Sequence, residues 1–154
     1  MNQEKTIAKA SEIINARANY VKDDRFEAGM AGYAAIGLID ENGYPTVSAK
    51  TIARADGIKW LNFATSPDAN AAARIKKDNR ASICICSGDF NINLVGKFEI
   101  ITDSDVKKDN WFAPMAGMWS GPDDPNFCVL RFNTERYNIF IVDGEDMLEA
   151  TGSL

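Results

Sequence analysis

Apolar residues recur along the chain first at helical spacing and then in short runs typical of strands. The residues at helical spacing, with charged residues between them, are Ile7, Ala10, Ile14 and Arg17. They predict an amphipathic N-terminal helix over about residues 3–20, which we expect to cover one end of a sheet. The mixed segment 22–32 is typical of a connector, and the apolar run 33–39 predicts the first strand.

Two dipeptides, Asn42-Gly43 and Asp56-Gly57, mark tight turns between strands. Both central residues of a type I′ turn need a positive φ, which asparagine and glycine tolerate best. The turns predict a second strand over residues 45–55 and a third over residues 58–65. We expect these three antiparallel strands to form a meander.

The remainder of the chain alternates short helices with strands. Ser66 is a good N-cap for a helix over residues 67–78, since Pro67 suits the first turn. Asp103 or Ser104 is expected to cap a helix that ends near residue 112. Four more strands are predicted, over residues 80–87, 91–102, 127–132 and 137–142.

Three further features complete this pattern. Gly96 is expected to bend the long strand or form a bulge in it. Residues 113–126, rich in Gly, Pro and Asp, form a predicted loop. The acidic tail, residues 143–154, is expected to be frayed.

Some seven strands with short turns and few helices favour a mainly β fold with flanking helices, a closed or nearly closed antiparallel barrel. At 154 residues with 45% apolar side chains, the chain matches a single domain over residues 1–154.

Charge and composition exclude several function classes. The chain has 22 acidic residues against 17 lysines and arginines, and no basic run interleaved with aromatics, so nucleic acid is not an expected partner. The longest apolar run is about a third of the roughly 20 residues that span a bilayer, and we expect no membrane association and a cytoplasmic location.

Cysteine and histidine content narrows the chemistry. Cys84, Cys86 and Cys128 leave at least one thiol unpaired, which fits a reducing compartment, and we interpret them as core residues without a metal. The chain has no histidine, which removes Ser-His-Asp and Cys-His catalysis and the usual general base. Any redox chemistry therefore requires a cofactor.

One segment indicates what that cofactor carries. Residues 63–66, Phe-Ala-Thr-Ser, end a predicted strand at the N-terminus of a predicted helix. A helix N-terminus favours anions, so the segment predicts a phosphate-bearing cofactor.

Five sequence pieces in this order resemble a known family. They are Asn42-Gly43-Tyr44-Pro45, residues 57–66, Arg74-Ile75-Lys76-Lys77-Asp78-Asn79, Val95-Gly96-Lys97 and Gly121-Pro122-Asp123-Asp124-Pro125. Over about residues 33–142 the chain resembles the FMN-binding split barrels of the pyridoxamine 5'-phosphate oxidase-like superfamily, within the branch of general stress proteins. The resemblance implies an antiparallel split β-barrel and a homodimer with two FMN molecules at its interface.

The resemblance also implies site residues. Those corresponding to positions beside the flavin ring are Ser48, Ala49 and Lys50, and those near the phosphate are Thr65, Ser66, Ala69, Asn70 and Ala71. Family members commonly have a basic residue at the position of Ser48 and a Ser-Arg-Lys type cluster near Ala69 to Ala71, and this chain has neither. Lys50 or Arg74 would then supply positive charge.

Each candidate residue also has an ordinary structural interpretation. Lys50 would stabilise an anionic ring edge, or it is a solvent-facing lysine. Trp119, in the Gly-Pro-Asp loop, would close over a flavin, or it packs within the loop or an interface. Asp123 and Asp124 are expected to form a turn.

The resemblance implies an oxidoreductase that cycles FMN with a reduced nicotinamide and an unknown acceptor. Two alternatives stay open. One is a non-catalytic binding or stress-associated dimer that has lost its phosphate site, and the other is a groove that accepts haem or a deazaflavin. Without histidine, haem would need a different axial ligand.

Overall fold

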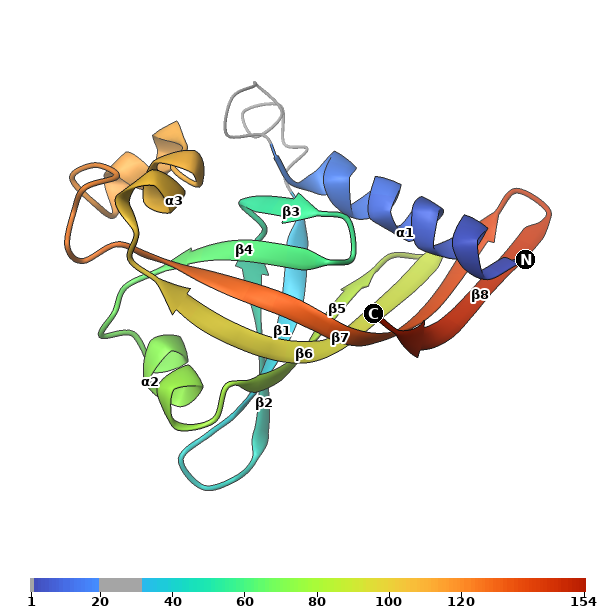
Figure 1. Cartoon of the computed structure of the whole chain (residues 1–154), viewed down its shortest axis with the longest axis horizontal. Coiled ribbons are helices and arrows are strands. Elements are labelled where there is room, and N and C mark those ends of the chain that lie inside the picture. The colour runs from blue at the N-terminus through green and yellow to red at the C-terminus, as the bar shows by residue number, and fades with distance from the viewer. Residues whose placement is uncertain (1, 20–31) are drawn as a thin grey trace.

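The strands form one antiparallel sheet that curls round until its two ends approach each other. The structure is a computed structural model that describes residues 2–19 and 32–154. Its strands are β1 (Tyr33–Ile39), β2 (Pro45–Thr51), β3 (Arg54–Asp56), β4 (Trp60–Thr65), β5 (Arg80–Cys86), β6 (Phe90–Ile101), β7 (Cys128–Asp143) and β8 (Asp146–Ser153). They lie in the order β2-β1-β5-β6-β7-β4-β3, with β8 also paired to β7 (Figure 1). This sheet confirms the predicted mainly β fold, an antiparallel split β-barrel with flanking helices.

A two-residue link joins the two ends of this sheet order. β2 ends at Thr51 and β3 begins at Arg54, yet β2 pairs only with β1 and β3 pairs only with β4. The linking residues Ile52 and Ala53 are 0% and 1% exposed, and the Ala53 amide donates to the Asn62 carbonyl. The single predicted strand over 45–55 is therefore two strands, and the predicted meander is wrong. Since the link is so short, the sheet has to curl to bring its ends together.

The two longest strands form the centre of the sheet. β6 pairs with β7 along its whole length, and the register shifts between Val95 and Gly96, which confirms the expected bulge. The predicted strands 127–132 and 137–142 are one continuous strand, because the polar residues between them continue to pair with β6. The first half of β7 pairs with β4 and the second half with β8, so these exposed polar residues lie where β7 changes partner.

The C-terminal segment is an ordered strand, and the prediction of a frayed tail is wrong. β8 pairs with β7 from Asp146 to Ser153, after a turn in which Gly144 has a φ of 65°. Leu148 and Ala150 alternate with exposed residues and are buried. They are covered by helix α1 (Asn2–Arg17), whose buried residues are Thr6, Ala10 and Ile14. The alternation of buried and exposed residues is therefore a better indicator of a strand in this segment than its acidic composition is of disorder. Helix α1 ends at Arg17, earlier than the predicted end near residue 20. Most of the connector over 22–32 lies outside the described residues.

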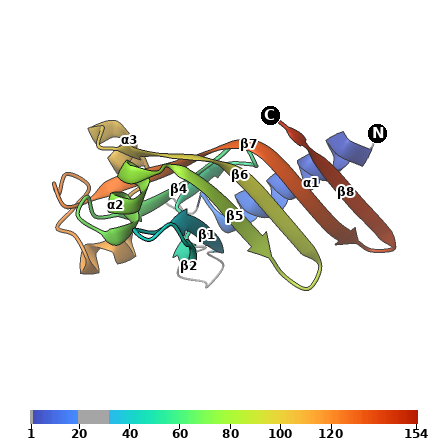
Figure 2. The same ribbon diagram turned by 90° about the horizontal axis from the view of Figure 1, so that it is seen from below.

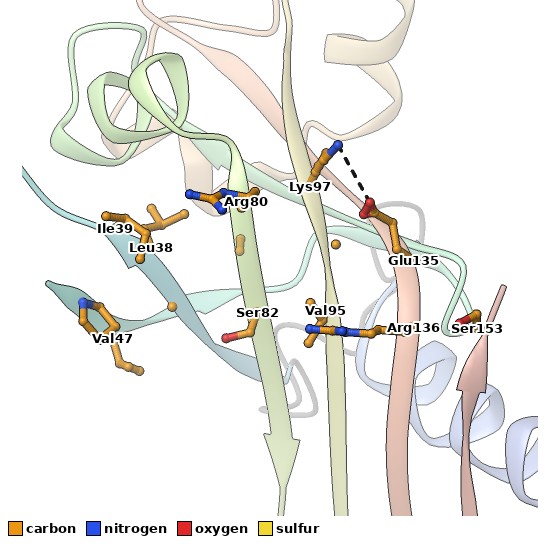
Figure 3. Close-up of a pocket in the computed structure, with 14 residues that line it drawn as sticks. Leu38, Ile39, Val47, Arg80, Ser82, Val95, Lys97, Glu135, Arg136 and Ser153 are labelled. Carbon is orange, nitrogen blue, oxygen red and sulfur yellow. Dashed lines mark ion pairs between the residues drawn. The ribbon is translucent and has the colours of Figure 1, made fainter. Parts of the chain in front are cut away.

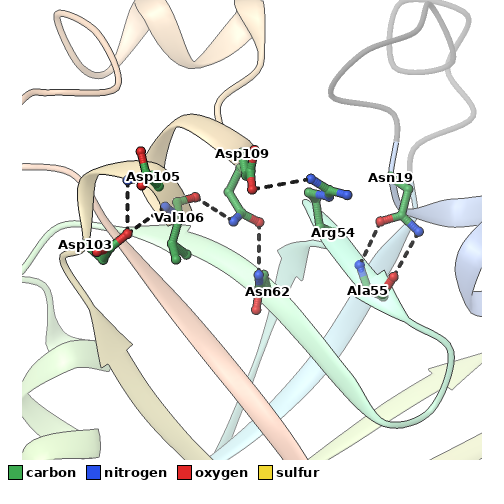
Figure 4. Close-up of polar contacts among 9 residues, drawn as sticks. Asn19, Arg54, Ala55, Asn62, Asp103, Asp105, Val106 and Asp109 are labelled. Carbon is green, nitrogen blue, oxygen red and sulfur yellow. Dashed lines mark hydrogen bonds and ion pairs between the residues drawn. The ribbon is translucent and has the colours of Figure 1, made fainter.

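The opposite end of the sheet carries the short helices α2 (Asn70–Lys77), α3 (Ser104–Asp109) and the 3₁₀ helix η2 (Ala113–Gly117) (Figure 2). Asp103 caps α3 as predicted, because its Oδ1 accepts from the amides of Asp105 and Val106 (Figure 4). The prediction of Ser66 as the N-cap of the next helix is wrong. The Ala69 amide donates to the Ser66 carbonyl in a turn, so α2 begins three residues later with Ala69 at its N-cap.

The first hairpin turn also differs from its predicted type. Of the residues at this turn, only Gly43 has a positive φ, 82°, and its amide donates to the Asp40 carbonyl. The Asp40 carboxylate accepts from the amides of Asn42 and Tyr44. Asn42 therefore does not adopt the left-handed conformation that a type I′ turn requires.

Aromatic rings fill the centre of the barrel. Phe98 packs edge-on against Phe63 and Phe132, with ring centroids 6.1 and 5.3 Å apart. Cys128 is buried, as predicted, but Cys84 is half-buried and Cys86 is exposed. Cys84 and Cys86 alternate with the buried Ile83 and Ile85 of β5 and thus lie on the outer face, so the prediction of three core cysteines is wrong for both of them.

The bulge gives a prediction about stability. A Cβ at Gly96 would collide with the backbone carbonyl of Asn133, whereas a Cβ at Gly88 would meet nothing within 4 Å. We expect Gly96→Ala to lower the free energy of unfolding by about 2 kcal/mol or more, because two backbones cannot separate without breaking the β6–β7 pairing. Gly88→Ala, measured in the same urea titration, should leave it nearly unchanged. Equal stability of the two variants would contradict this account of the bulge.

Candidate functional site

A groove lies between strand β2 and helix α2, at the place where the resemblance puts a phosphate. Its volume is about 330 Å³. The residues that line it are Ile36, Leu38, Thr46, Val47, Ser48, Lys50, Ala69, Asn70, Ala71 and Arg74. The fold brings Ser48, Lys50 and Asn70 together here, although they come from two separate elements. Successive side chains of a strand point to opposite faces, and this alternation places Thr46, Ser48 and Lys50 on the face of β2 that lines the groove.

Arg74 brings a guanidinium to this groove. Its Nη1 donates to the Thr46 hydroxyl at 3.1 Å, and that hydroxyl donates to the Leu38 carbonyl at 3.0 Å. The Nε of Arg74 is buried without a hydrogen-bond partner. The Glu41 carboxylate lies 3.5 Å from Nε, which is an ion pair but not a hydrogen bond, and the Glu41 side chain is 65% exposed. A buried N–H without an acceptor is costly, so an added acceptor at this position would be favourable.

The N-terminus of α2 opens on the same groove. Its N-cap residue, Ala69, has no side chain that accepts a hydrogen bond, so the first amides of the helix lack a side-chain cap. Asn70 adds a side-chain amide at the first helical position, and Ala69 and Ala71 leave the approach to the backbone open. Uncapped helix amides and an adjacent guanidinium are both suited to bind an anion.

Lys50 lies between this groove and a second pocket. The second pocket has a volume of about 300 Å³ and is mainly apolar. Its lining residues are Lys50, Thr51, Ala64, Phe112, Pro114, Met115, Met118 and Trp119. Burial lowers the pKa of Lys50, and the nearby Cys128 thiol opposes this shift. Lys50 is therefore a half-buried amine that links a polar groove to an apolar pocket.

Trp119 forms one wall of the apolar pocket and is only 7% exposed. Its Nε1 donates to the Asn126 carbonyl at 2.7 Å and to the Ser66 hydroxyl at 3.2 Å. Its ring packs against Phe127, with centroids 5.2 Å apart. Trp119 therefore packs within a small second core, and its contact with Ser66 ties the loop to the end of β4.

Two ionic groups hold the loop that carries Trp119. The Asp124 carboxylate accepts from the amides of Ser120 and Asn126, and these backbone hydrogen bonds lower the pKa of Asp124. The buried Lys107 donates to the Asp124 carbonyl at 2.9 Å. The turn-forming role predicted for Asp124 is confirmed.

Positive charge gathers near this end of β4, although the whole chain is acidic. Burial raises the pKa of the Cys128 thiol, and the positive charges of Lys107, Lys76 and Lys50 oppose this shift. These three lysines thus act on one point beside Thr65, which pairs with Cys128. Three lysines therefore lie near this end of β4, although the chain carries a net charge of −5.

The remaining predicted residues lie nearby but do not line either pocket. Ala49 is exposed on the other face of β2, and Thr65 is buried at the end of β4. Sequence reasoning missed Thr46, which the alternation with Ser48 would have indicated. It also missed Met115 and Met118, because no periodic pattern in the loop shows which side chains face β2.

The largest pocket lies elsewhere, on the outer face of the sheet (Figure 3). It has a volume of about 650 Å³. Its lining includes small residues, Gly37, Ala81, Ser82 and Gly96, and charged residues, Arg80, Lys97, Glu135 and Arg136. Lys97 and Glu135 pair across it at 3.9 Å. Pocket size alone therefore does not identify the predicted site, and convergent polar groups are the better guide.

Among the described residues, no helix is long and apolar enough to cross a membrane. The same residues contain no group of three or more His, Cys, Asp or Glu side chains placed to hold a metal ion.

Solved structures with the same fold include several stress proteins. The chain is similar to a Clostridium acetobutylicum protein related to general stress protein 26, with 23% identity, a TM-score of 0.66, and coverage of 86% of this chain and 94% of the other. It is also similar to general stress protein 26 from Bacillus anthracis, with 16% identity, a TM-score of 0.67 and coverage of 97% and 100%. A haem-binding protein from Mycobacterium smegmatis shares the fold at 19% identity and a TM-score of 0.59, over 80% of this chain and 54% of that one.

Sequence comparison gives the family directly. No curated protein is detectably similar to the chain in sequence. The model of the pyridoxamine 5'-phosphate oxidase family, however, matches residues 15–140, which include β1 to β6 and most of β7. Together with the split-barrel sheet, this match shows that the chain belongs to the pyridoxamine 5'-phosphate oxidase family.

Proposed function

We propose that the chain binds FMN along the β2–α2 groove and acts as an FMN-dependent oxidoreductase. The observation that carries the proposal is the position of Arg74, whose buried Nε has no hydrogen-bond partner and adjoins a groove that also receives Lys50 and the uncapped N-terminus of α2. The family's usual basic residues are missing at Ser48 and Ala69 to Ala71. Arg74 and Lys50 supply two positive charges to the same groove from other positions.

The dimensions support a ligand that spans both pockets. Small-molecule sites commonly measure about 300–1,000 Å³, and each pocket lies near the lower end of that range. Because Lys50 lines both, the phosphate would lie against Asn70 and Arg74 while the ring extends past Lys50 toward Trp119 and Met115. A bound flavin supplies hydride and electron transfer, with a reduced nicotinamide as the proposed donor.

The protein's own groups would bind and orient this cofactor. Thr46 holds the Arg74 guanidinium in place through its hydroxyl. Lys50 would place a positive charge beside the ring or the ribityl chain, and Trp119 and Met115 would exclude water from the ring. The described residues of the two pockets include no carboxylate, so we assign no proton-transfer residue.

We further propose that the outer face of β1 and β2 is a homodimer interface. Val47 is 72% exposed and Tyr33 is 67% exposed, although both are apolar and lie on regular strands. Gly37 of β1 and Ser82 of β5 line the pocket of about 650 Å³ on this face. Figure 3 shows Ser82 and Val47 there. An exposed apolar rim around a hollow of small residues is typical of a surface that another chain covers.

The phosphate contact gives the first prediction for this site. Fluorescence titration should show that FMN binds more tightly than riboflavin, which lacks the phosphate. Arg74→Gln should weaken FMN binding about ten- to hundredfold and leave riboflavin binding unchanged, since a charge-assisted hydrogen bond contributes about 1.5–3 kcal/mol.

Lys59→Gln is the matched control, because it removes one exposed positive charge at the β3–β4 turn. Equal binding of FMN and riboflavin would contradict the phosphate assignment. An absence of both binding and an FMN-dependent rise in melting temperature would instead favour the non-catalytic dimer.

The lowered pKa of Lys50 gives a prediction about pH. Only the protonated amine attracts an anionic ligand, so FMN affinity should fall as pH rises through the Lys50 pKa. Because burial lowers this pKa, the loss should begin at a lower pH than it would for an ordinary solvent-exposed lysine. Lys50→Arg should retain its affinity as pH rises in the same titration. A wild-type affinity that does not change with pH would remove Lys50 from the site.

The interface gives a third prediction. Val47→Asp should raise the dissociation constant of the dimer about tenfold or more, because it places a carboxylate in an apolar contact. Light scattering after size-exclusion chromatography measures this. Met147→Asp is the control, since Met147 is 71% exposed on β8 at the β7–β8 hairpin. If the wild-type protein is a monomer, or if both variants dissociate equally, the proposed interface is wrong.

A further inference from the structure

A small polar cavity separate from the β2–α2 groove lies under α3. It has a volume of about 180 Å³, equivalent to about six water molecules. Its lining residues are Arg54, Trp60, Asn62, Val106, Asp109, Asn110 and Arg131. They come from β3, β4, β7 and α3, and none of them lines the β2–α2 groove or the pocket beside Trp119.

Arg131 is held rigidly at this cavity with its outer nitrogens unused. Its guanidinium lies over the Trp60 ring, 4.5 Å from the ring centroid, and its Nε donates to the Asn62 Oδ1 at 3.0 Å. Among the described residues, Nη1 and Nη2 have no hydrogen-bond acceptor. A fixed guanidinium with two parallel free N–H groups matches the two oxygens of a carboxylate.

Two buried amides lie behind Arg131 and keep N–H donors that are not used within the described part of the protein. Asn62 and Asn110 are 1% and 2% exposed. The Asn62 Nδ2 donates to the Asn110 Oδ1 at 3.2 Å, and the Asn110 Nδ2 donates to the Val106 carbonyl at 2.8 Å (Figure 4). The side-chain oxygens of Asn62 and Asn110 each accept a hydrogen bond, from Arg131 and from Asn62 respectively, while each side-chain nitrogen keeps a second N–H. These N–H groups add hydrogen-bond donors to a wall that also carries the Asp109 carboxylate.

Arg54 provides a second positive charge with only a weak partner. Its Nη1 lies 4.0 Å from the Asp109 Oδ2, and the Asp109 side chain is 61% exposed (Figure 4). Exposed ion pairs at this distance contribute little. Arg54 and Arg131 outnumber Asp109 among the lining residues, although Glu99 lies opposite Arg131 in the β6–β7 pairing. An incoming anion would compete with Asp109 for Arg54.

We propose that this cavity is a binding site for a small organic carboxylate, held by the Arg131 guanidinium and supported by Arg54. The volume restricts the ligand to a few non-hydrogen atoms. The Arg131 fork matches the two oxygens of a carboxylate, and the Asp109 carboxylate in the lining repels a singly charged carboxylate group less than it repels phosphate. Asp109 acts against binding, since it offers Arg54 an internal carboxylate. This site is independent of the proposed FMN site.

Calorimetric titration of the full chain with acetate, malonate and succinate, at constant ionic strength in chloride, tests the proposal. At least one should bind, and more tightly than inorganic phosphate. Arg131→Gln should weaken this binding by at least about tenfold, whereas Asp109→Asn should strengthen it. The two variants are thus expected to change the affinity in opposite directions. If the cluster were only structural, removing the Asp109 carboxylate would not increase the affinity for a carboxylate.

Lys108→Gln is the matched control, since it removes an exposed charge from the same helix outside the cavity and should leave binding unchanged. Arg131→Lys keeps the positive charge but loses the fork, so it should also bind weakly if it folds. The proposal is overturned if no carboxylate binds, if phosphate binds more tightly, or if Asp109→Asn weakens binding.

Discussion

The fold depends on one chain constraint, the two-residue connection between β2 and β3. These strands lie at opposite ends of the sheet order, yet Ile52 and Ala53 alone separate them. Thr51 and Arg54 are three Cα–Cα steps apart and so lie within about 11 Å of each other, which means that the sheet has to curl until its ends approach each other. The complete burial of both residues, together with the hydrogen bond from Ala53 to β4, fixes this closure. The curl creates the aromatic core and brings β2 beside α2.

The groove follows from that closure, but its charge comes from particular residues. The β2 face supplies Thr46, Ser48 and Lys50, and α2 supplies Arg74 one turn after its uncapped N-terminus. Thr46 links the two elements, because its hydroxyl accepts from Arg74 and donates to β1. Positive charge therefore lies near an anion-binding helix terminus without the basic residues that the family usually has. We interpret this as a relocated phosphate clamp.

The sequence predicts the helices and strands better than it predicts which strands pair with each other. The apolar run of β1 and the cap of α3 have strong local signals, and the structure agrees with both. Residues 45–55 look like one strand because nothing in their alternation marks the point where pairing changes from β1 to β4. Likewise, the polar residues in the middle of β7 look like a turn, although they are exposed positions of a continuous strand. These errors concern long-range pairing, which local patterns do not contain.

For the candidate site, the sequence gives the positions on β2 and α2 through the family resemblance. Alternation with Ser48 would also have indicated Thr46, but that Arg74 of α2 lies against this face of β2 depends on the curl of the sheet and is found only in the structure. The cavity at Arg131 has no sequence signal at all, since its residues are spread over four elements.

The central claim is that a phosphate binds at the N-terminus of α2 beside Arg74. Amide chemical shifts of the ¹⁵N-labelled protein test it most directly, when FMN and riboflavin are added separately. The account predicts that FMN, but not riboflavin, shifts the amide signals of Asn70, Ala71 and Ala72. Shifts that are absent from these three residues, or equal for the two flavins, would contradict it.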